Sequence, residues 1–140
     1  MDSARLVPEL DVTDLDVSLV FYVELLRFSV AWERPEERFV YLEHAGAQLM
    51  LEEAAGPGRH LRTAPLERPF GRGINLQIEV DDVDAVYSRL LSAGHIPMVP
   101  MEERWYRTGA AFRGHRQFVI ADPDGYLLRL FTPLRERTPV

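Results

Sequence analysis

The residues of this sequence that could do chemistry recur at alternate positions in four short segments. Alternate side chains of a strand share one face, so we expect each set to lie together on one side of a sheet. Carboxylates and amides there could bind a cation or a polar small molecule. The alternative is an ordinary solvated face of an antiparallel sheet. The alternating residues are Glu9, Asp11, Gln48, Met50, Glu52, Asn75, Gln77, Glu79 and Arg129.

Aromatic residues gather in the strands expected to flank this polar face. They are Trp105, Tyr106, Phe112 and Phe118. Polar groups that converge between aromatic walls are typical of small-molecule sites, so we predict a binding site here. An enzymatic alternative would use Glu52 or Glu79 as an acid or base and Arg129 as an electrophile.

The four histidines give no second indication of a metal site. His44, His60, His95 and His115 lie in a turn, a connector, a helix end and a strand. None of the pairs has the helical or hairpin spacing of metal ligands, so we interpret all four as scattered surface residues.

The elements that must position these residues come from an internal repeat. Residues Val7–Arg27 return as Asn75–His95 at an offset of 68, and Gly46–Glu52 return as Gly125–Phe131 at an offset of 79. Each copy predicts a strand, a capping Asp and an amphipathic helix, followed by three strands. The sequence therefore predicts an α+β fold of tandem βαβββ modules.

We expect one domain over residues 1–140, with modules at about 6–53 and 74–133 and a long connector at 54–72. The predicted helices follow Asp14 and Asp82. The predicted strands are Leu6–Val12, Phe28–Glu33, Arg38–Glu43, Ala47–Glu53, Ile74–Val80, Met98–Arg107, Phe112–Ile120 and Tyr126–Thr132.

Composition narrows the possible functions. The chain is 46% hydrophobic and has no cysteine, so it is globular and has neither disulfides nor a thiolate metal site. A formal charge of −6 without a basic cluster argues against nucleic-acid binding. No apolar run reaches the ~18 residues of a membrane helix, and no signal segment is present, so we expect a cytoplasmic protein.

Several motifs carry a family resemblance. They are Val12–Leu15, Ser18–Tyr22, Leu25–Phe28 and the terminal stretch Asp122–Arg129, DPDGYLLR. These residues resemble the vicinal oxygen chelate superfamily, which includes glyoxalase I, extradiol dioxygenases, fosfomycin-resistance enzymes and bleomycin-resistance proteins. The resemblance implies modules whose strands curve as half-barrels around a cavity with the helices outside, usually in a homodimer.

The resemblance also implies where a metal would be held. Enzymes of the superfamily place His or Glu at the positions of Val7, Met50, Asn75 and Arg129. The residues present here are poor ligands for a hard divalent ion. We therefore expect no metal, no cofactor and no catalytic residue; a lyase, isomerase or dioxygenase with a displaced or absent metal remains the alternative.

Within the superfamily the chain looks most like the bleomycin-resistance proteins, through Val7–Leu10 and Gly46–Glu52. The resemblance implies a metal-free homodimer that sequesters a cationic, aromatic, bleomycin-like ligand in a cleft at its interface. Glu9, Asp11, Glu52 and Glu79 would supply the acidic groups, and Trp105, Tyr106 and Phe118 would stack. A scaffold that uses the repeat only to dimerise is a third possibility.

Two departures from the family pattern stand out. Arg113-Gly114-His115 occupies a stretch where a Trp-Gly pair is common, which puts bleomycin itself in question as the ligand. Arg27 stands where the family prefers Gly, and a left-handed Arg would cost ~1 kcal/mol or more. We therefore expect the end of the first helix to differ here.

Overall fold

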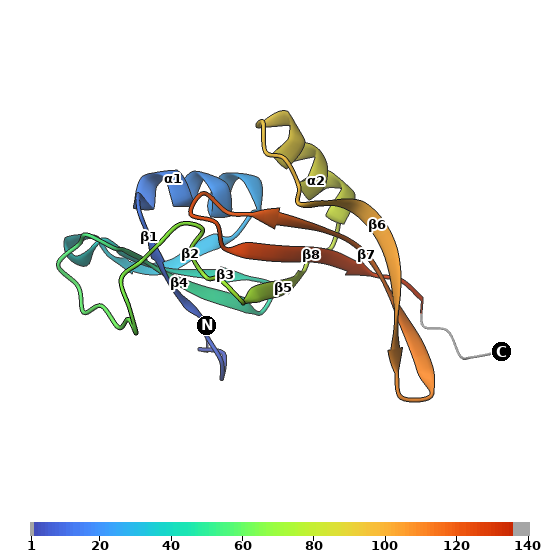
Figure 1. The fold of residues 1–140 in the computed structure, drawn as a ribbon. Coiled ribbons are helices and arrows are strands. Elements are labelled where there is room, and N and C mark those ends of the chain that lie inside the picture. Colours follow the sequence, from blue (N-terminus) through green and yellow to red (C-terminus); the bar gives the residue numbers. More distant parts are fainter. Residues whose placement is uncertain (1, 136–140) are drawn as a thin grey trace. The chain divides into compact units, whose positions relative to one another are not determined.

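The computed structural model describes residues 2–135 and contains two four-stranded sheets, each accompanied by a helix (Figure 1). The strand orders are β1-β4-β3-β2 and β5-β8-β7-β6, so the second sheet repeats the order of the first. This confirms the predicted α+β fold of tandem βαβββ modules. None of the helices in the described part is long and apolar enough to cross a membrane.

The chain forms two compact units. Unit 1 comprises the described residues up to Phe70 together with Asp122–Gly125, and unit 2 comprises Gly71–Ala121 and the described residues from Tyr126 onward. Unit 1 contains β1 (Glu9–Val12), α1 (Leu15–Leu19), η1 (Val20–Leu25), β2 (Ser29–Arg34), η2 (Pro35–Glu37), β3 (Phe39–His44) and β4 (Ala47–Glu53). Unit 2 contains β5 (Asn75–Glu79), α2 (Val83–Ser92), β6 (Val99–Thr108), β7 (Ala111–Ala121) and β8 (Leu127–Pro133).

The first helix begins where the sequence predicts. The Asp14 side chain accepts hydrogen bonds from the N–H groups of Asp16 and Val17, at 3.0 and 3.2 Å, which satisfies donors of the first turn. After Leu19 the helix continues as the π-helix η1, and the N–H of Leu26 donates to the carbonyl of Phe21 at 3.0 Å. The predicted helix is therefore present, with a π-helical second half.

Helix α2 is capped in the same way by Asp82, whose carboxylate accepts from the N–H of Ala85 at 3.1 Å. Val83, Val86 and Leu90 of the predicted apolar face are buried. Leu91, next to Leu90, is 44% exposed, so the buried stripe of α2 is narrow.

The first and last strands of each module run parallel and are direct neighbours. Asp11 lies opposite Glu52 in unit 1, and Gln77 lies opposite Arg129 in unit 2. The residues between them point the other way and form the core. Those buried residues are Leu10, Val12, Leu49, Leu51, Ile78, Leu128 and Leu130.

The Asp122-Pro123-Asp124-Gly125 turn is held within unit 1 by its two carboxylates. The buried Tyr22 hydroxyl donates to Asp122 at 2.7 Å. Asp124 accepts from the N–H of Thr13 at 3.0 Å and from the Arg68 guanidinium at 2.8 Å. The acidic residues of this family signature therefore have a structural role here.

The end of the first helix does not differ from the family pattern, and the expectation based on Arg27 is wrong. Arg27 adopts a φ of 68°, the left-handed conformation that favours Gly. The next residue, Phe28, is only 2% exposed, and His44 Nδ1 lies 3.0 Å from the Arg27 carbonyl oxygen. The turn that inserts Phe28 into the core thus sets the backbone at Arg27 despite its side chain.

Replacing Arg27 by Gly should therefore stabilise the protein by about 1 kcal/mol, because glycine has no Cβ to clash with the backbone in the left-handed conformation. The contact between His44 and the backbone carbonyl of residue 27 is kept. Urea denaturation of both proteins measures this difference. The matched control is Arg27→Ala, which removes the same charge and keeps a Cβ. An equal gain in the Ala and Gly variants would contradict the strain argument.

Candidate ligand-binding site

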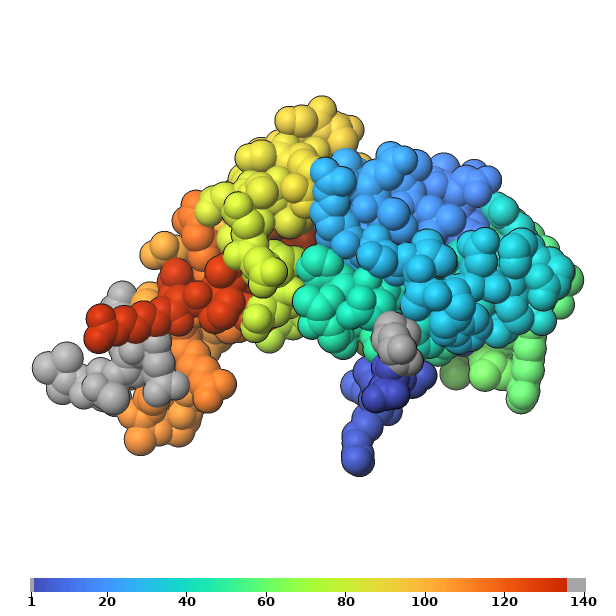
Figure 2. Space-filling model, turned by 180° about the vertical axis from the view of Figure 1, so that it is seen from behind, coloured from blue at the N-terminus to red at the C-terminus, as the bar shows by residue number. Residues whose placement is uncertain are grey.

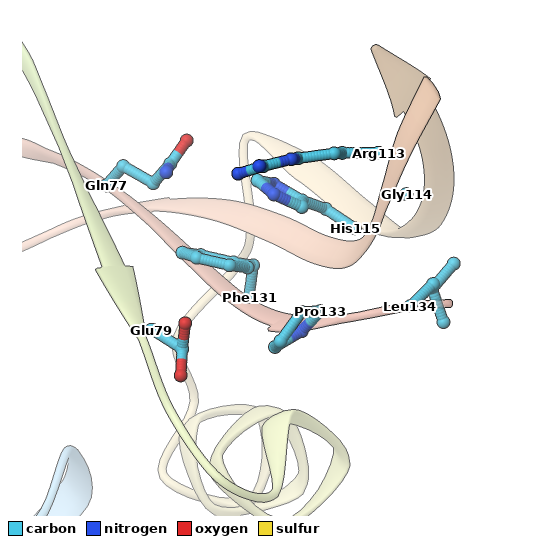
Figure 3. Close-up of a pocket in the computed structure, with 8 residues that line it drawn as sticks. All are labelled: Gln77, Glu79, Arg113, Gly114, His115, Phe131, Pro133 and Leu134. Atoms are coloured by element: carbon cyan, nitrogen blue, oxygen red, sulfur yellow. The ribbon is translucent and has the colours of Figure 1, made fainter. Parts of the chain in front are cut away.

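A pocket of about 340 Å³ lies on the polar face of unit 2, where β5, β7 and β8 meet (Figure 3). It combines charged, amide, aromatic and apolar groups in a small volume. Its lining residues are Gln77, Glu79, Arg113, Gly114, His115, Phe131, Pro133 and Leu134. A concave site with a few polar groups among apolar ones is typical of small-molecule binding.

Two stacked rings are the main aromatic feature of this pocket. His115 and Phe131 lie nearly parallel, with ring centroids 4.0 Å apart and planes 17° apart. His115 pairs with Pro133 in the sheet, and Phe131 is two residues before Pro133, so the two rings are diagonal neighbours. Tyr106 meets His115 edge-on at 5.4 Å, and Arg113 extends alongside the imidazole (Figure 3).

Next to the rings lies a polar network with too few partners. The Gln117 amide nitrogen donates to Glu102 at 3.0 Å and to the Tyr106 hydroxyl at 2.6 Å. Arg129 Nη1 donates to the same hydroxyl at 3.4 Å. Three further buried atoms have no hydrogen-bond partner among the described residues, namely His115 Nδ1, Gln117 Oε1 and Arg129 Nε.

Unpaired buried polar atoms are rare and costly in folded proteins, so these atoms need a hydrogen-bond partner from water, from a neighbouring side chain or from a ligand. Burial also lowers the pKa of His115 below its ordinary value. The ring is therefore neutral at pH 7, when it can stack without adding a third cation beside Arg113 and Arg129.

In unit 1 the predicted acidic residues are also on one face, but the connector partly neutralises them. Arg62 Nε lies 2.9 Å from Asp11 Oδ2, and His60 Nδ1 lies 3.4 Å from Asp11 Oδ1 and 3.9 Å from Glu52 Oε2. Glu52 is 3% exposed, and burial raises its pKa. Glu9 is exposed at the start of β1.

Gln48 is buried and its amide is already bonded within unit 1. Its oxygen accepts from the Tyr41 hydroxyl at 2.5 Å and from the N–H of Ala4 at 2.8 Å, and its nitrogen donates to the carbonyl of Asp2 at 2.9 Å. The N-terminal residues, which stand out from unit 1 in dark blue in Figure 2, are anchored by this side chain. Gln48 is thus a poor candidate for contacting a ligand.

The polar face of unit 1 also carries an aromatic pair that the sequence analysis missed. Trp32 is 44% exposed and stacks on Tyr41, with centroids 4.9 Å apart and planes 17° apart. Tyr41 lies opposite Met50, so it shares the face of that predicted site residue. Strand alternation in β2 and β3 was the signal that could have identified the pair.

Two of the predicted stacking residues lie on the opposite side of the unit 2 sheet. Phe118 is fully buried and its ring lies 4.8 Å from that of Tyr87 in α2, so it belongs to the core. A Cβ at Gly114 would lie 2.8 Å from three atoms of the Trp105 ring, so Trp105 covers Gly114. Trp105 pairs with Gly114, whereas Tyr106 pairs with Arg113, so only Tyr106 shares the face of His115.

The remaining predicted residues of unit 2 are placed as alternation requires. Asn75, Gln77 and Glu79 are exposed along β5, and Arg129 is half-buried on β8. The structure adds Arg113, His115 and Phe131 to the site. The interpretation of all histidines as scattered surface residues is therefore wrong for His115, and also for His60, which packs against Asp11 and Glu52.

Enzymes of the superfamily that this sequence resembles hold a metal ion at four positions. The residues at these positions here are not suited to binding a metal ion. In unit 1, Val7 has no lone pair, and Met50 offers only a thioether beside Tyr41. In unit 2, Arg129 places a guanidinium on the polar face, and Asn75 offers a single neutral amide oxygen. Hard divalent cations require carboxylate or imidazole ligands, so this donor set is unsuitable.

The family model described as "Glyoxalase/Bleomycin resistance protein/Dioxygenase superfamily" matches residues 7–130. The comparison with curated proteins gave no match.

Solved structures with the same fold include TioX from Micromonospora sp. ML1, at 21% identity and a TM-score of 0.70, covering 94% of this chain and 100% of that one. TnmS3, an antibiotic binding protein from Streptomyces sp. CB03234, is 23% identical with a TM-score of 0.63, covering 95% and 98%. A protein of unknown function from Agrobacterium tumefaciens str. C58 is 26% identical with a TM-score of 0.67, covering 96% and 98%.

The lowered pKa of His115 makes a testable prediction about stability. As the pH falls through about 6.5, His115 becomes protonated in the unfolded chain, whereas the buried ring of the folded protein stays neutral. The unfolded state then binds more protons, so the free energy of unfolding decreases as the pH falls. His115→Phe keeps a ring against Phe131 and removes the titration. Urea denaturation at pH 7 and pH 5 should show a larger loss of stability in the natural protein than in this variant; parallel losses would contradict the prediction.

Proposed function

Because the chain belongs to the Glyoxalase/Bleomycin resistance protein/Dioxygenase superfamily, we propose that it binds an aromatic, antibiotic-like small molecule and holds it without transforming it. The observation that carries this proposal is the unit 2 pocket, in which the stacked His115 and Phe131 rings lie beside buried polar atoms that lack partners.

The pocket defines the chemistry of the ligand. A planar ring would extend the stack of His115 and Phe131, an arrangement worth roughly 0.5–1.5 kcal/mol beyond the buried area. Glu79 lines the pocket and offers a carboxylate to a cationic group. Arg113 lines it as well, so the ligand that fits best carries hydrogen-bond acceptors in addition to its cation.

The neighbouring network extends this match. Arg129 Nε is a buried donor and Gln117 Oε1 a buried acceptor, both unpaired within the described residues. A ligand with an acceptor and a donor on one edge would satisfy both atoms and remove their desolvation penalty. Polar pairing of this kind supplies specificity, while ring stacking supplies most of the affinity.

Two further points support binding without reaction. The superfamily includes bleomycin-resistance proteins, and one protein with this fold is an antibiotic binding protein. Enzymes of the superfamily use a bound metal ion as a Lewis acid. The side chains at the corresponding positions of this chain are unsuitable ligands for a hard cation. Sequestration requires only a complementary surface.

We include a homodimer in this proposal, as the resemblance to bleomycin-resistance proteins implies, with the ligand bound in clefts at the interface. Sedimentation equilibrium with and without ligand tests this part separately. A monomer at all concentrations that still binds ligand would remove the dimer from the proposal and leave the pocket.

Isothermal titration calorimetry with bleomycin, and with a neutral planar aromatic antibiotic, tests the proposed function. We expect a dissociation constant in the range of tens of micromolar or tighter for at least one of them. Phe131→Ala should weaken binding about 2- to 12-fold, because one ring of the stack is lost.

The matched control is Trp105→Leu, which removes a larger ring from the other face of the same sheet and should leave affinity unchanged. Circular dichroism confirms that both variants are folded. Absence of binding by both compounds, or equal weakening by the two variants, would count against this pocket as the binding site.

A further inference from the structure

Unit 1 contains a cluster of three potential metal ligands that is separate from the superfamily's usual metal positions. Asp11 of β1 and Glu52 of β4 lie opposite each other in the parallel pair, so their carboxylates are side by side. His60 reaches them from the connector, which leaves the end of β4 as a long loop (Figure 1). One ligand atom from each residue lies within 4.8 Å of the others.

The imidazole of His60 points its Nδ1 atom toward the carboxylates. Its Nε2 lies 2.7 Å from the carbonyl oxygen of Gly56, which can only accept, so Nε2 carries the hydrogen. In the neutral ring Nδ1 is then the unprotonated nitrogen. Nδ1 is buried, has no hydrogen-bond partner among the described residues, and faces Asp11 Oδ1 at 3.4 Å and Glu52 Oε2 at 3.9 Å.

The Glu52 carboxylate is the second indication of a ligand. Its side chain is only 4% exposed, yet no N–H group of the described residues donates a hydrogen bond to it. Its neighbours include the carboxyl group of Glu9, with which it makes a hydrogen bond, and the carboxylate of Asp11. A cation bound between these groups would offset the cost of burying their charge.

The connector is shaped to hold this arrangement. The backbone at Gly58 lies close over the Glu52 carboxylate, and a Cβ there would overlap Glu52 Oε1 unless that side chain shifted. Arg62 bonds Asp11 through Oδ2 at 2.9 Å and the carbonyl of Ala54 at 2.9 Å, which orients the other oxygen, Oδ1, toward His60. Outer contacts of this kind fix the ligands of metal sites.

Charge and geometry both favour a divalent ion. When all three carboxyl groups, Glu9, Asp11 and Glu52, are ionised and His60 is neutral, the single Arg62 guanidinium leaves a local charge of about −2. Zinc bonds of about 2.0–2.2 Å place tetrahedral ligand atoms roughly 3.3–3.6 Å apart. The distances of 3.4 and 3.9 Å from His60 Nδ1 are close to this spacing.

We propose that Asp11, Glu52 and His60 bind a divalent cation of the zinc type, which fixes the connector to the sheet of unit 1. One imidazole and two carboxylates suit zinc better than calcium or magnesium, which prefer oxygen ligands alone. The fourth position is open to water or to the neighbouring Glu9 carboxylate. This site shares no residue with the unit 2 pocket, so it stands or falls independently of the proposed function.

Calorimetric titration of ZnCl2 into the untagged, chelator-treated protein at pH 7 tests the proposal. We expect one zinc ion per chain and a rise in melting temperature on addition of zinc. His60→Ala should weaken binding by at least about tenfold, since even outer contacts of metal sites are worth 10- to 100-fold. His44→Ala is the matched control, because it removes a histidine outside the cluster and should bind zinc normally.

Glu52→Gln provides a second test that does not depend on how well the His60 variant folds. It replaces a buried carboxylate by a neutral amide of similar size, so the metal-free variant should be at least as stable as the natural protein at pH 7. Its melting temperature should no longer respond to zinc. The proposal would be overturned if no zinc binding were detected at about 100 µM free metal, or if all three variants bound zinc equally. Protonated His60 would then be the counter-charge of the carboxylates.

Discussion

The parallel pairing of the first and last strands in each module is the constraint from which the rest of the structure follows. It places Asp11 beside Glu52 in unit 1 and Gln77 beside Arg129 in unit 2. Because side chains alternate along a strand, the same register sends Leu51 and Leu128 into the core. A shift by one residue would bury the charges and expose the core, so packing and chemistry are fixed together.

The two units use this shared frame in different ways. In unit 1 the carboxylates of Asp11 and Glu52 meet two side chains of the connector, the imidazole of His60 and the guanidinium of Arg62. In unit 2 the polar face carries its own cation, Arg129, and stacks rings beside it. The first arrangement concentrates negative charge around a point, while the second presents a planar surface. The two copies of the module thus carry two chemically different surfaces.

The residues that identify the family are largely structural. Asp122 and Asp124 hold their turn through Tyr22, Thr13 and Arg68 rather than facing a ligand. Likewise Asp14 and Asp82 are helix caps. The side chains of the two polar faces lie on the strands between these anchors. This explains how one superfamily can include both enzymes and binding proteins.

The sequence alone determined the tandem modules, nearly all strand and helix positions and the polar faces, because these depend on local periodicity and on capping residues. Alternation also implied that Tyr106 and Trp105 face opposite ways, but the irregular register of β6 hid which one faces the site. Only the tertiary structure showed that Phe118 lies beneath α2 and that His115 stacks on Phe131.

The path of the connector, and with it the position of His60, could not be predicted, since a segment without periodicity is placed by long-range contacts such as those to Asp11. The left-handed Arg27 has the same origin: packing of Phe28 outweighs the local preference of the backbone.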